Sequence, residues 1–415
     1  MTFYSDNAKR KTFLTRMALL GSSLLSEPLT VLLCLLPFIL AKDLKASAWQ
    51  ISLLVSLRPI MSLVSFYWSS LLGRRPHLLR ANLIVSGILA RLPFLLIFFF
   101  HSTGYLIFAA ATHILFSRAG IPAWMEMLKR NLPKEPRERL FSFSWMLAYA
   151  EGVGVGFAMG FLLDVDSGYW RYLFFASGLI GLLGVFLQYR VPLEPVECAP
   201  IEKLGFWQMI VQPWKDSFHL MRTRPDFARF QWAFMWGGAG IMLVIAVLPF
   251  YFVKTLAISH STFSTARAVC MGIGVVLTSN VWGKALSRYK LTPLTSFVIL
   301  LFALFPACLL LAPFHISWLY AAYILYGIAQ GGSHIVWHLS GPLFAGQQDS
   351  SFYSGINVVM VGLRGMIFPF IGSLLASLVG PAPVLCLGML CCLSGALMTR
   401  FFVVPKEASL KKPES

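Results

Sequence analysis

The chain has 415 residues, of which 57% are hydrophobic and only 12% are charged. Soluble domains carry about 25% charged residues, so this composition leaves too little polar surface to cover a globule. It excludes a soluble enzyme, a disordered protein and a disulfide scaffold. The net charge of +17 could suggest a nucleic-acid partner. The excess Lys and Arg residues lie in short loops between apolar runs, however, and we expect no such partner.

Twelve apolar runs follow one another along the chain. They cover residues 17–41, 48–72, 79–100, 104–124, 140–163, 171–191, 228–253, 262–286, 291–312, 317–340, 354–378 and 381–404. A run of about 20 apolar residues can cross a bilayer as a helix, in which every backbone group is hydrogen-bonded within its own segment. The sequence therefore predicts an all-α, polytopic membrane protein with twelve transmembrane helices.

The basic residues divide unequally between the two sides of these spans. Of the 34 Lys and Arg residues, 25 fall in the termini, loops and adjoining run ends of one side, four in the loops and adjoining run ends of the other, and five in the interior of the runs. Loops rich in Lys and Arg face the cytoplasm. We therefore predict that both termini are cytoplasmic and that the protein lies in the cell (inner) membrane.

The longest stretch between apolar runs covers residues 192–227 and divides the chain into two halves of six predicted spans. We predict an N-terminal six-helix bundle over residues 1–191, and a C-terminal bundle with a short cytoplasmic tail over residues 228–415. Within the central stretch, apolar side chains recur at helical spacing, namely Phe206, Ile210, Trp214, Phe218 and Met221. This pattern is typical of an amphipathic helix on the cytoplasmic membrane surface, and a structured linker explains it equally well.

The two halves share a sequence repeat. The segment Leu-Pro-Phe at residues 36–38 recurs at residues 248–250, and four residues that follow it recur at the same offset of 212 positions. The same offset places Arg118-Ala-Gly120 over Gln330-Gly-Gly332. Because many matches share one offset, the repeat predicts two pseudo-symmetric bundles that arose by duplication.

Three segments carry a resemblance to a known family. The loop Gly73-Arg74-Arg75 after the second span resembles the end of the loop 2–3 signature of the major facilitator superfamily (MFS), although the usual preceding acidic residue is absent. Arg118-Ala-Gly120 resembles the family's span 4 signature, and the glycines of residues 152–160 resemble its Gly-rich motif. The resemblance implies a secondary active transporter that works by alternating access. It also implies that spans 1, 4, 7 and 10 line a central cavity, whereas spans 2, 5, 8 and 11 join the halves.

Seven charged residues lie inside the predicted spans, where each is costly and is usually aimed at a partner or at water. They are Glu27, Arg58, Arg91, Arg118, Glu151, Arg267 and Arg364. In the arrangement that the resemblance implies, all but Arg91 fall on cavity or contact helices. It would also place Glu151 beside Arg267 as a salt bridge, and Arg58 beside Arg364 as a pair of like charges.

These charges have a functional and a structural interpretation. Arg58, Arg118 and Arg364 offer forked donors for a carboxylated or other anionic substrate. Glu27 or Glu151 could carry a coupling proton, with Arg267 as a gating partner. The structural alternative is that the charges are buried pairs that fix helix register, or side chains that snorkel to the interface.

The predicted tenth span carries Gln330, His334 and His338 four residues apart, and therefore on one helical face. We predict that they line a cavity and contact substrate, with plain interhelical hydrogen bonding as the alternative. No third ligand accompanies the two His residues, so we expect no metal site. The sequence has no Walker-type loop and no catalytic cluster in its loops, and we expect neither a cofactor nor an enzyme activity.

Together these patterns predict a transporter of MFS type for a small, anionic or amphipathic solute, with protons as possible coupling ions and the lipid bilayer as surroundings. Two other functions stay open at this point. One is a flippase for lysolipids or other amphiphiles, and the other is a non-transporting receptor or assembly factor on the same fold. The sequence leaves the oligomeric state open.

Overall fold

The computed structural model describes residues 2–73, 78–100, 102–192, 206–288, 290–345 and 350–402. Every regular element within these ranges is a helix, which confirms the all-α fold class. Within the same ranges, nine helical stretches are long and apolar enough to cross a membrane. The other three predicted spans correspond to α2, to the pair α3 and α4, and to α13, so the prediction of a polytopic membrane protein is confirmed.

The chain divides into two compact units. Unit 1 comprises Met1–Lys203 and Ala257–Val269, and unit 2 comprises Leu204–Leu256 and Cys270–Ser415. The segment Ala257–Val269, at the start of the predicted eighth span, thus packs with the first unit. The predicted division into an N-terminal bundle (residues 1–191), a central stretch (192–227) and a C-terminal bundle (228–415) stays a prediction.

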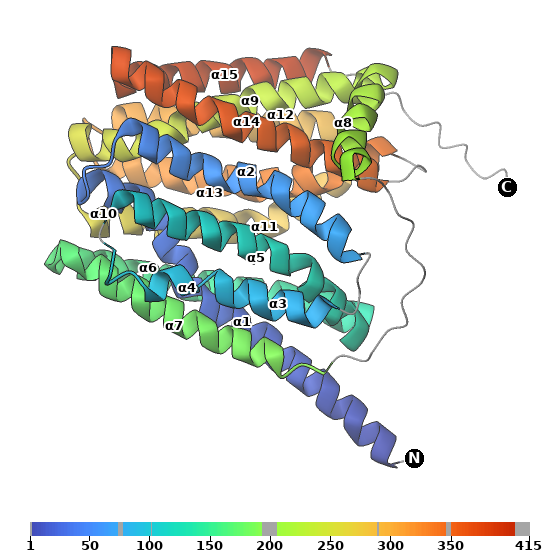
Figure 1. The fold of residues 1–415 in the computed structure, drawn as a ribbon. Helices are drawn as coiled ribbons and strands as arrows, with labels where there is room; N and C mark the ends of the chain where they lie inside the picture. The colour runs from blue at the N-terminus through green and yellow to red at the C-terminus, as the bar shows by residue number, and fades with distance from the viewer. Residues whose placement is uncertain are drawn as a thin grey trace. The chain divides into compact units, whose positions relative to one another are not determined.

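The helices of unit 1 are followed most easily in Figure 1, where they run from blue to green, with the short helix α10 in yellow. They are α1 (Thr2–Lys42), α2 (Ala48–Gly73), α3 (Leu79–Leu89), α4 (Leu92–Leu95), α5 (Thr103–Asn131), α6 (Lys134–Val165), η2 (Ser167–Tyr169), α7 (Trp170–Tyr189) and α10 (His260–Ser264). The π-helical turn η4 (Thr265–Cys270) connects α10 to unit 2.

Unit 2 holds the remaining elements of the chain that the structure describes. They are α8 (Phe206–Thr223), α9 (Pro225–Phe250), η3 (Tyr251–Thr255), α11 (Met271–Arg288), α12 (Leu291–Leu311), α13 (Ser317–Ala345), α14 (Ser350–Val379) and α15 (Pro381–Phe402).

The same helix pairs pack together inside each unit. In unit 1, α1 packs against α6 and α7, and α5 packs against α2 and α3. In unit 2, the corresponding helix α9 packs against α14 and α15, and α13 packs against α11 and α12. This correspondence shows that the sequence repeat is also a repeat of packing, as the predicted pseudo-symmetry requires.

The loops after the first and the seventh spans repeat even in their backbone conformation. Lys45 has φ 50° and Ala257, which lies 212 positions later, has φ 48°. Both lie in the left-handed region, which costs a non-glycine residue about 1 kcal/mol. Two residues further on, Ser47 accepts a hydrogen bond from the N–H of Gln50 and Ser259 accepts one from Thr262. These serines cap the helices that follow.

The third predicted span is broken near Arg91. The helix α3 ends at Leu89, and a second short helix begins at Leu92 with Pro93 in its first turn. Proline has no N–H to continue the helical hydrogen bonds of the preceding turn. The Arg91 guanidinium supplies a hydrogen bond to a carbonyl of the turn before the break, since its Nη1 donates to the carbonyl of Gly87 at 2.9 Å. Its Nη2 donates to Ser26 Oγ at 2.8 Å.

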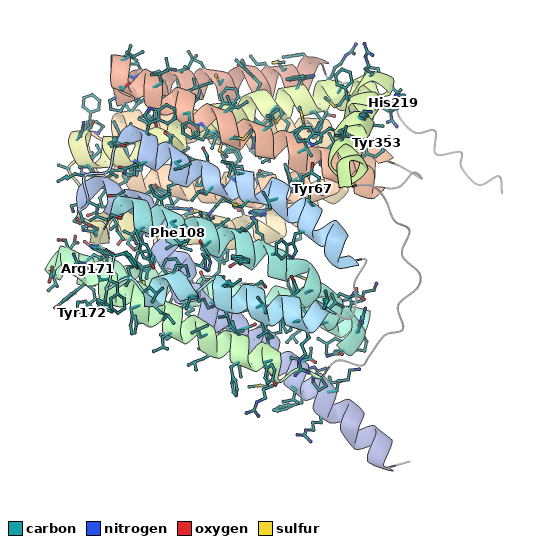
Figure 2. The ribbon with its side chains drawn as sticks, viewed as in Figure 1. Tyr67, Phe108, Arg171, Tyr172, His219 and Tyr353 are labelled. Atoms are coloured by element: carbon teal, nitrogen blue, oxygen red, sulfur yellow. The ribbon has the colours of Figure 1, made fainter. Side chains whose placement is uncertain are left out.

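The central stretch of the chain does contain a helix, α8. Leu220 and Met221 near its end pack on the hydrophobic core of unit 2, whereas Trp214 and Phe218 are exposed. After α8, Arg224 pairs with Asp226 through two hydrogen bonds of 3.0 Å, which raise the pKa of the guanidinium. Arg224 also donates to the hydroxyl of buried Tyr353 at 3.1 Å and so ties the start of α9 to α14. Tyr353 is labelled in Figure 2.

Candidate functional site

Unit 1 brings two of the predicted carboxyl groups together. Glu27 on α1 lies close enough to Glu151 on α6 for the two groups to repel each other when both are charged. A glycine makes room for the first of them, because a Cβ at position 152 would lie 2.6 Å from Oε1 of Glu27. One carboxyl oxygen of Glu151, Oε2, is buried and has no hydrogen-bond partner among the residues that the structure describes. Two carboxyl groups in such a setting are costly to keep charged at the same time.

Unit 1 also places two predicted arginines near each other. Arg58 on α2 and Arg118 on α5 are close enough to interact electrostatically, and Nη2 of Arg58 lies 3.8 Å from Cys34 Sγ. On α5, His113 contributes a further polar group that sequence analysis did not single out. Its Nδ1 lies 2.9 Å from the carbonyl of Ala90, and its Nε2 lies 3.3 Å from Ser117 Oγ. Arg58 and Arg118 therefore give positive charge to the part of unit 1 where α2 packs against α5.

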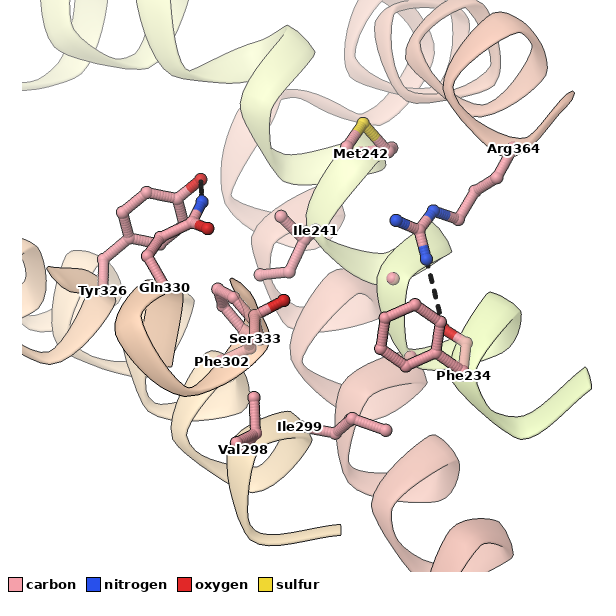
Figure 3. Close-up of a pocket in the computed structure, with 12 residues that line it drawn as sticks. Phe234, Ile241, Met242, Val298, Ile299, Phe302, Tyr326, Gln330, Ser333 and Arg364 are labelled. Carbon is pink, nitrogen blue, oxygen red and sulfur yellow. Dashed lines mark hydrogen bonds between the residues drawn. The ribbon is translucent and has the colours of Figure 1, made fainter. Parts of the chain in front are cut away.

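Unit 2 contains a cavity of about 130 Å³ between α9, α12, α13 and α14 (Figure 3). Its lining is mostly apolar, with polar groups supplied by Arg364, Gln330, Tyr326 and Ser333. None of the twelve lining residues is acidic. A cavity of this size is large enough to hold several waters or the polar end of a solute.

Among the predicted site residues whose burial the structure describes, Arg364 is the most deeply buried, with 7% of its surface exposed. Its Nη1 donates to the backbone carbonyl of Phe234 at 3.1 Å, and its guanidinium lies 5.6 Å from the centre of the Phe234 ring. Its Nε–H is buried and has no hydrogen-bond partner in the described part of the chain. The side chain fits only because position 238 is a glycine, since a Cβ there would overlap the guanidinium.

The polar stripe predicted on the tenth span is only partly assembled around this cavity. Gln330 lines the cavity and donates through Nε2 to the hydroxyl of Tyr326 at 2.7 Å. His334, one turn further along α13, is exposed and is not among the lining residues. The side chain of His338 lies outside the described part of the chain. The residues missed by sequence analysis were the aromatic ones, since Phe234 and Tyr326 look like ordinary core residues in so apolar a chain.

The remaining predicted residues receive no test from the geometry. Gly73 is the last residue of α2, and Arg74 and Arg75 lie outside the described residues. Arg267 lies in η4. The predicted pairing of Arg267 with Glu151, and the predicted proximity of Arg58 and Arg364, stay predictions.

Comparison with solved structures places this fold among membrane transporters. A POT family transporter in complex with 5-aminolevulinic acid matches with a TM-score of 0.73 and 12% identity, covering 95% of this chain and 96% of that chain. A mutant of the nucleoside transporter NupG matches with a TM-score of 0.70 and 12% identity over 93% and 98%. The xylose transporter XylE from E. coli matches with a TM-score of 0.66 and 14% identity over 96% and 98%.

The class that the fold defines is therefore the twelve-helix membrane transporters. The family model of the Major Facilitator Superfamily matches residues 18–369, and the chain belongs to that superfamily. The resemblance found in the sequence is thereby confirmed, and a general secondary-transporter function is supported. No curated protein matches the sequence.

Proposed function

We propose that the protein is a secondary transporter that moves a small anionic solute with an apolar body by alternating access. The observation that carries this proposal is the buried guanidinium of Arg364, which lines a cavity without acidic residues and retains an unpartnered N–H. Burying a charge without a counter-ion costs several kcal/mol. An anionic group in the cavity would offset that cost through charge-assisted hydrogen bonds.

The rest of the cavity supports a solute that is apolar away from its charge. Its apolar walls are formed by the ring of Phe234 and by the side chains of Ile241, Met242, Val298, Ile299 and Phe302. Such walls stabilise an aliphatic or aromatic body, and the hydroxyl of Ser333 and the amide of Gln330 add orienting polar groups. This lining also suits an amphiphile, so the proposal includes amphipathic anions, and a lysolipid flippase is the second candidate.

We further propose that Glu27 and Glu151 form the proton-binding pair of the transport cycle. Their mutual repulsion and the unpartnered Oε2 of Glu151 favour binding of one proton between them. Arg118 and Arg58 are proposed to attract the solute into unit 1. The positive-inside asymmetry supports cytoplasmic termini in an inner membrane.

A ligand panel tests the proposal. Purified protein in nanodiscs is heated in the presence of small carboxylates and phosphate monoesters, each paired with its neutral amide or alcohol. We expect stabilisation by anionic members only, and uptake of those members into proteoliposomes under an inward proton gradient. Lysophosphatidylglycerol in the panel separates the flippase from the transporter of soluble solutes.

Two arginine variants supply the controls. Arg364→Gln should lose the stabilisation by anions, whereas Arg229→Gln, which alters an exposed arginine of α9 in the same unit, should retain it. Equal stabilisation by the charged and neutral members of each pair would overturn the proposed anion site. So would an unchanged anion response in Arg364→Gln.

A further inference from the structure

A second polar cluster in unit 1, separate from Glu27 and Glu151, surrounds His260 at the start of α10. Nε2 of the imidazole lies 2.9 Å from Oδ2 of Asp43, and Nδ1 lies 3.1 Å from Oδ1 of Asp164. The two carboxylates belong to the ends of α1 and α6. The His260 side chain is 4% exposed and that of Asp43 is 9% exposed, so water has little access to their contact.

The proton count of this arrangement is constrained by its geometry. A neutral imidazole has one N–H and one lone pair, whereas an imidazolium donates from both nitrogens. Carboxylates on both sides of the ring are satisfied together only when His260 carries two protons. Within the described ranges, the other charged group in contact with the ring is Lys42. The proton therefore also brings the charge of the four side chains from −1 to zero.

Lys42 gives the ring an alternative partner when the proton leaves. Its Nζ lies 3.4 Å from Nδ1 of His260 and donates to the carbonyl of Ile258 at 3.2 Å. A neutral Nδ1 would accept a hydrogen bond from Lys42, and Asp164 would then lose its contact with the ring. Asp164 would keep the backbone N–H groups of His260 and Ser261, at 2.7 and 2.9 Å, and the hydrogen bond from the side chain of Ser261.

The segment held in this way has features of a movable element. The π-helical turn η3 precedes the segment, and the π-helical turn η4 forms its last part. Such turns occur frequently at functional sites. Figure 1 shows α10 beside the loop that joins α1 and α2. The cluster is not a requirement of the repeated fold, because the residues 212 positions away are Ala48, Thr255 and Ala376 in place of His260, Asp43 and Asp164.

A metal ion does not explain the cluster. The two carboxylates contact opposite nitrogens of one ring, so a single ion could not bridge all three groups. Within the described residues, no group of three His, Cys, Asp or Glu residues is arranged to hold a metal.

We propose that His260 is a proton-binding site whose protonated form clamps the segment Ala257–Val269 to the ends of α1 and α6. The positive-inside asymmetry predicts that this end of unit 1 faces away from the cytoplasm, so the acidity outside the cell controls the clamp. The proton binds at Nδ1 of His260, which then donates to Asp164. When the proton is lost, Nδ1 accepts a hydrogen bond from Lys42 instead. The segment is therefore held more firmly in acid than at neutral or alkaline pH. This proposal does not depend on the nature of the solute.

Hydrogen exchange of the full-length protein in nanodiscs tests the clamp directly. Amide exchange of peptides covering residues 257–269 is measured at pH 5.5 and 8.0 and corrected for the intrinsic exchange rates. We expect about tenfold greater protection at pH 5.5 in the wild type. His260→Gln, which cannot bind the proton, should show the same protection at both pH values.

Two further variants complete the test. Asp43→Asn leaves a ring that satisfies its neighbours without a second proton, so its pH dependence should fall to less than threefold, and it supplies the answer if His260→Gln does not fold. His219→Gln changes an exposed histidine of α8 and should behave as the wild type (Figure 2). Wild-type protection that is equal at the two pH values would overturn the proposal. So would undiminished pH dependence in both His260→Gln and Asp43→Asn.

Discussion

At corresponding helix crossings, each unit packs a charged side chain against a glycine, and the two charges have opposite sign. Where α1 crosses α6 in unit 1, Glu27 of the first helix lies against Gly152 of the second. Where α9 crosses α14 in unit 2, Gly238 of the first helix accommodates Arg364 of the second. Arg364 stands 212 positions after Gly152, so glycine and charged residue have exchanged helices. Duplication has therefore preserved the crossing, whereas the chemistry placed there has diverged, so that the crossing is acidic in unit 1 and basic in unit 2.

The span 4 signature has diverged at the corresponding position as well. Arg118 in unit 1 is replaced by Gln330 in unit 2, and Gln330 donates to Tyr326 instead of repelling another arginine. Unit 2 consequently concentrates its membrane charge in one residue, Arg364, while unit 1 distributes charge over α1, α2, α5 and α6. Each of the following variants tests whether the units differ in function as they differ in charge.

Arg364→Gln should have the largest effect. It removes the only guanidinium that lines the unit 2 cavity and about two charge-assisted hydrogen bonds to the solute, or about 3 kcal/mol. We expect the dissociation constant of an anionic solute to rise about 100-fold. Isothermal titration of the purified variant with the best anion of the panel measures this change. A rise of the dissociation constant below threefold would show that Arg364 of unit 2 does not bind the anion.

Glu27→Gln should have the next largest effect, on coupling and not on binding. The variant lacks one of the two carboxyl groups that share a proton in the proposed cycle. We expect proton-driven accumulation of the solute in proteoliposomes to fall about tenfold, while solute exchange without a gradient changes less than twofold. Accumulation at the wild-type level would remove Glu27 from the coupling mechanism.

The sequence allowed the fold to be predicted well because its signals are local. Apolar runs predicted the twelve spans, and the offset of 212 positions anticipated loops as similar as those of Lys45 and Ala257. The break at Arg91 was missed because the apolar run continues through it, although Pro93 supplied a signal.

The candidate sites could be predicted only in part. Isolated charges in apolar runs identified Arg364 and Glu27, since a charge in a membrane span needs a reason. The glycines that accommodate them could not be assigned, because contacts between helices distant in sequence do not appear in any local pattern. The cluster of Asp43, Asp164 and His260 was missed for the same reason, although all three residues lie at span ends on the same predicted side.

Gly238→Ala and Gly152→Ala form a matched pair with smaller effects. An added methyl group overlaps the guanidinium of Arg364 in the first variant and crowds the carboxyl group of Glu27 in the second. Overpacking of this kind costs about 1–3 kcal/mol, so both proteins should unfold at lower temperature. We expect anion affinity to fall about fivefold in Gly238→Ala and less than twofold in Gly152→Ala. Equal losses of affinity in the two variants would contradict the proposal that unit 2 binds the anion and unit 1 binds the proton.

Arg91→Gln should have the smallest effect on transport, although Arg91 is also an arginine inside a span. Its guanidinium is engaged by Ser26 and by the carbonyl of Gly87, and Gly181 of α7 leaves the space that its Nε occupies. The loss of two hydrogen bonds should lower the free energy of unfolding by about 1–3 kcal/mol, seen as a lower unfolding temperature in nanodiscs. Transport per folded molecule should change less than twofold, because these bonds hold α3 against α1 at the break before α4. A large loss of transport with normal thermal stability would instead place Arg91 in the solute pathway, together with Arg58 and Arg118 of the same unit.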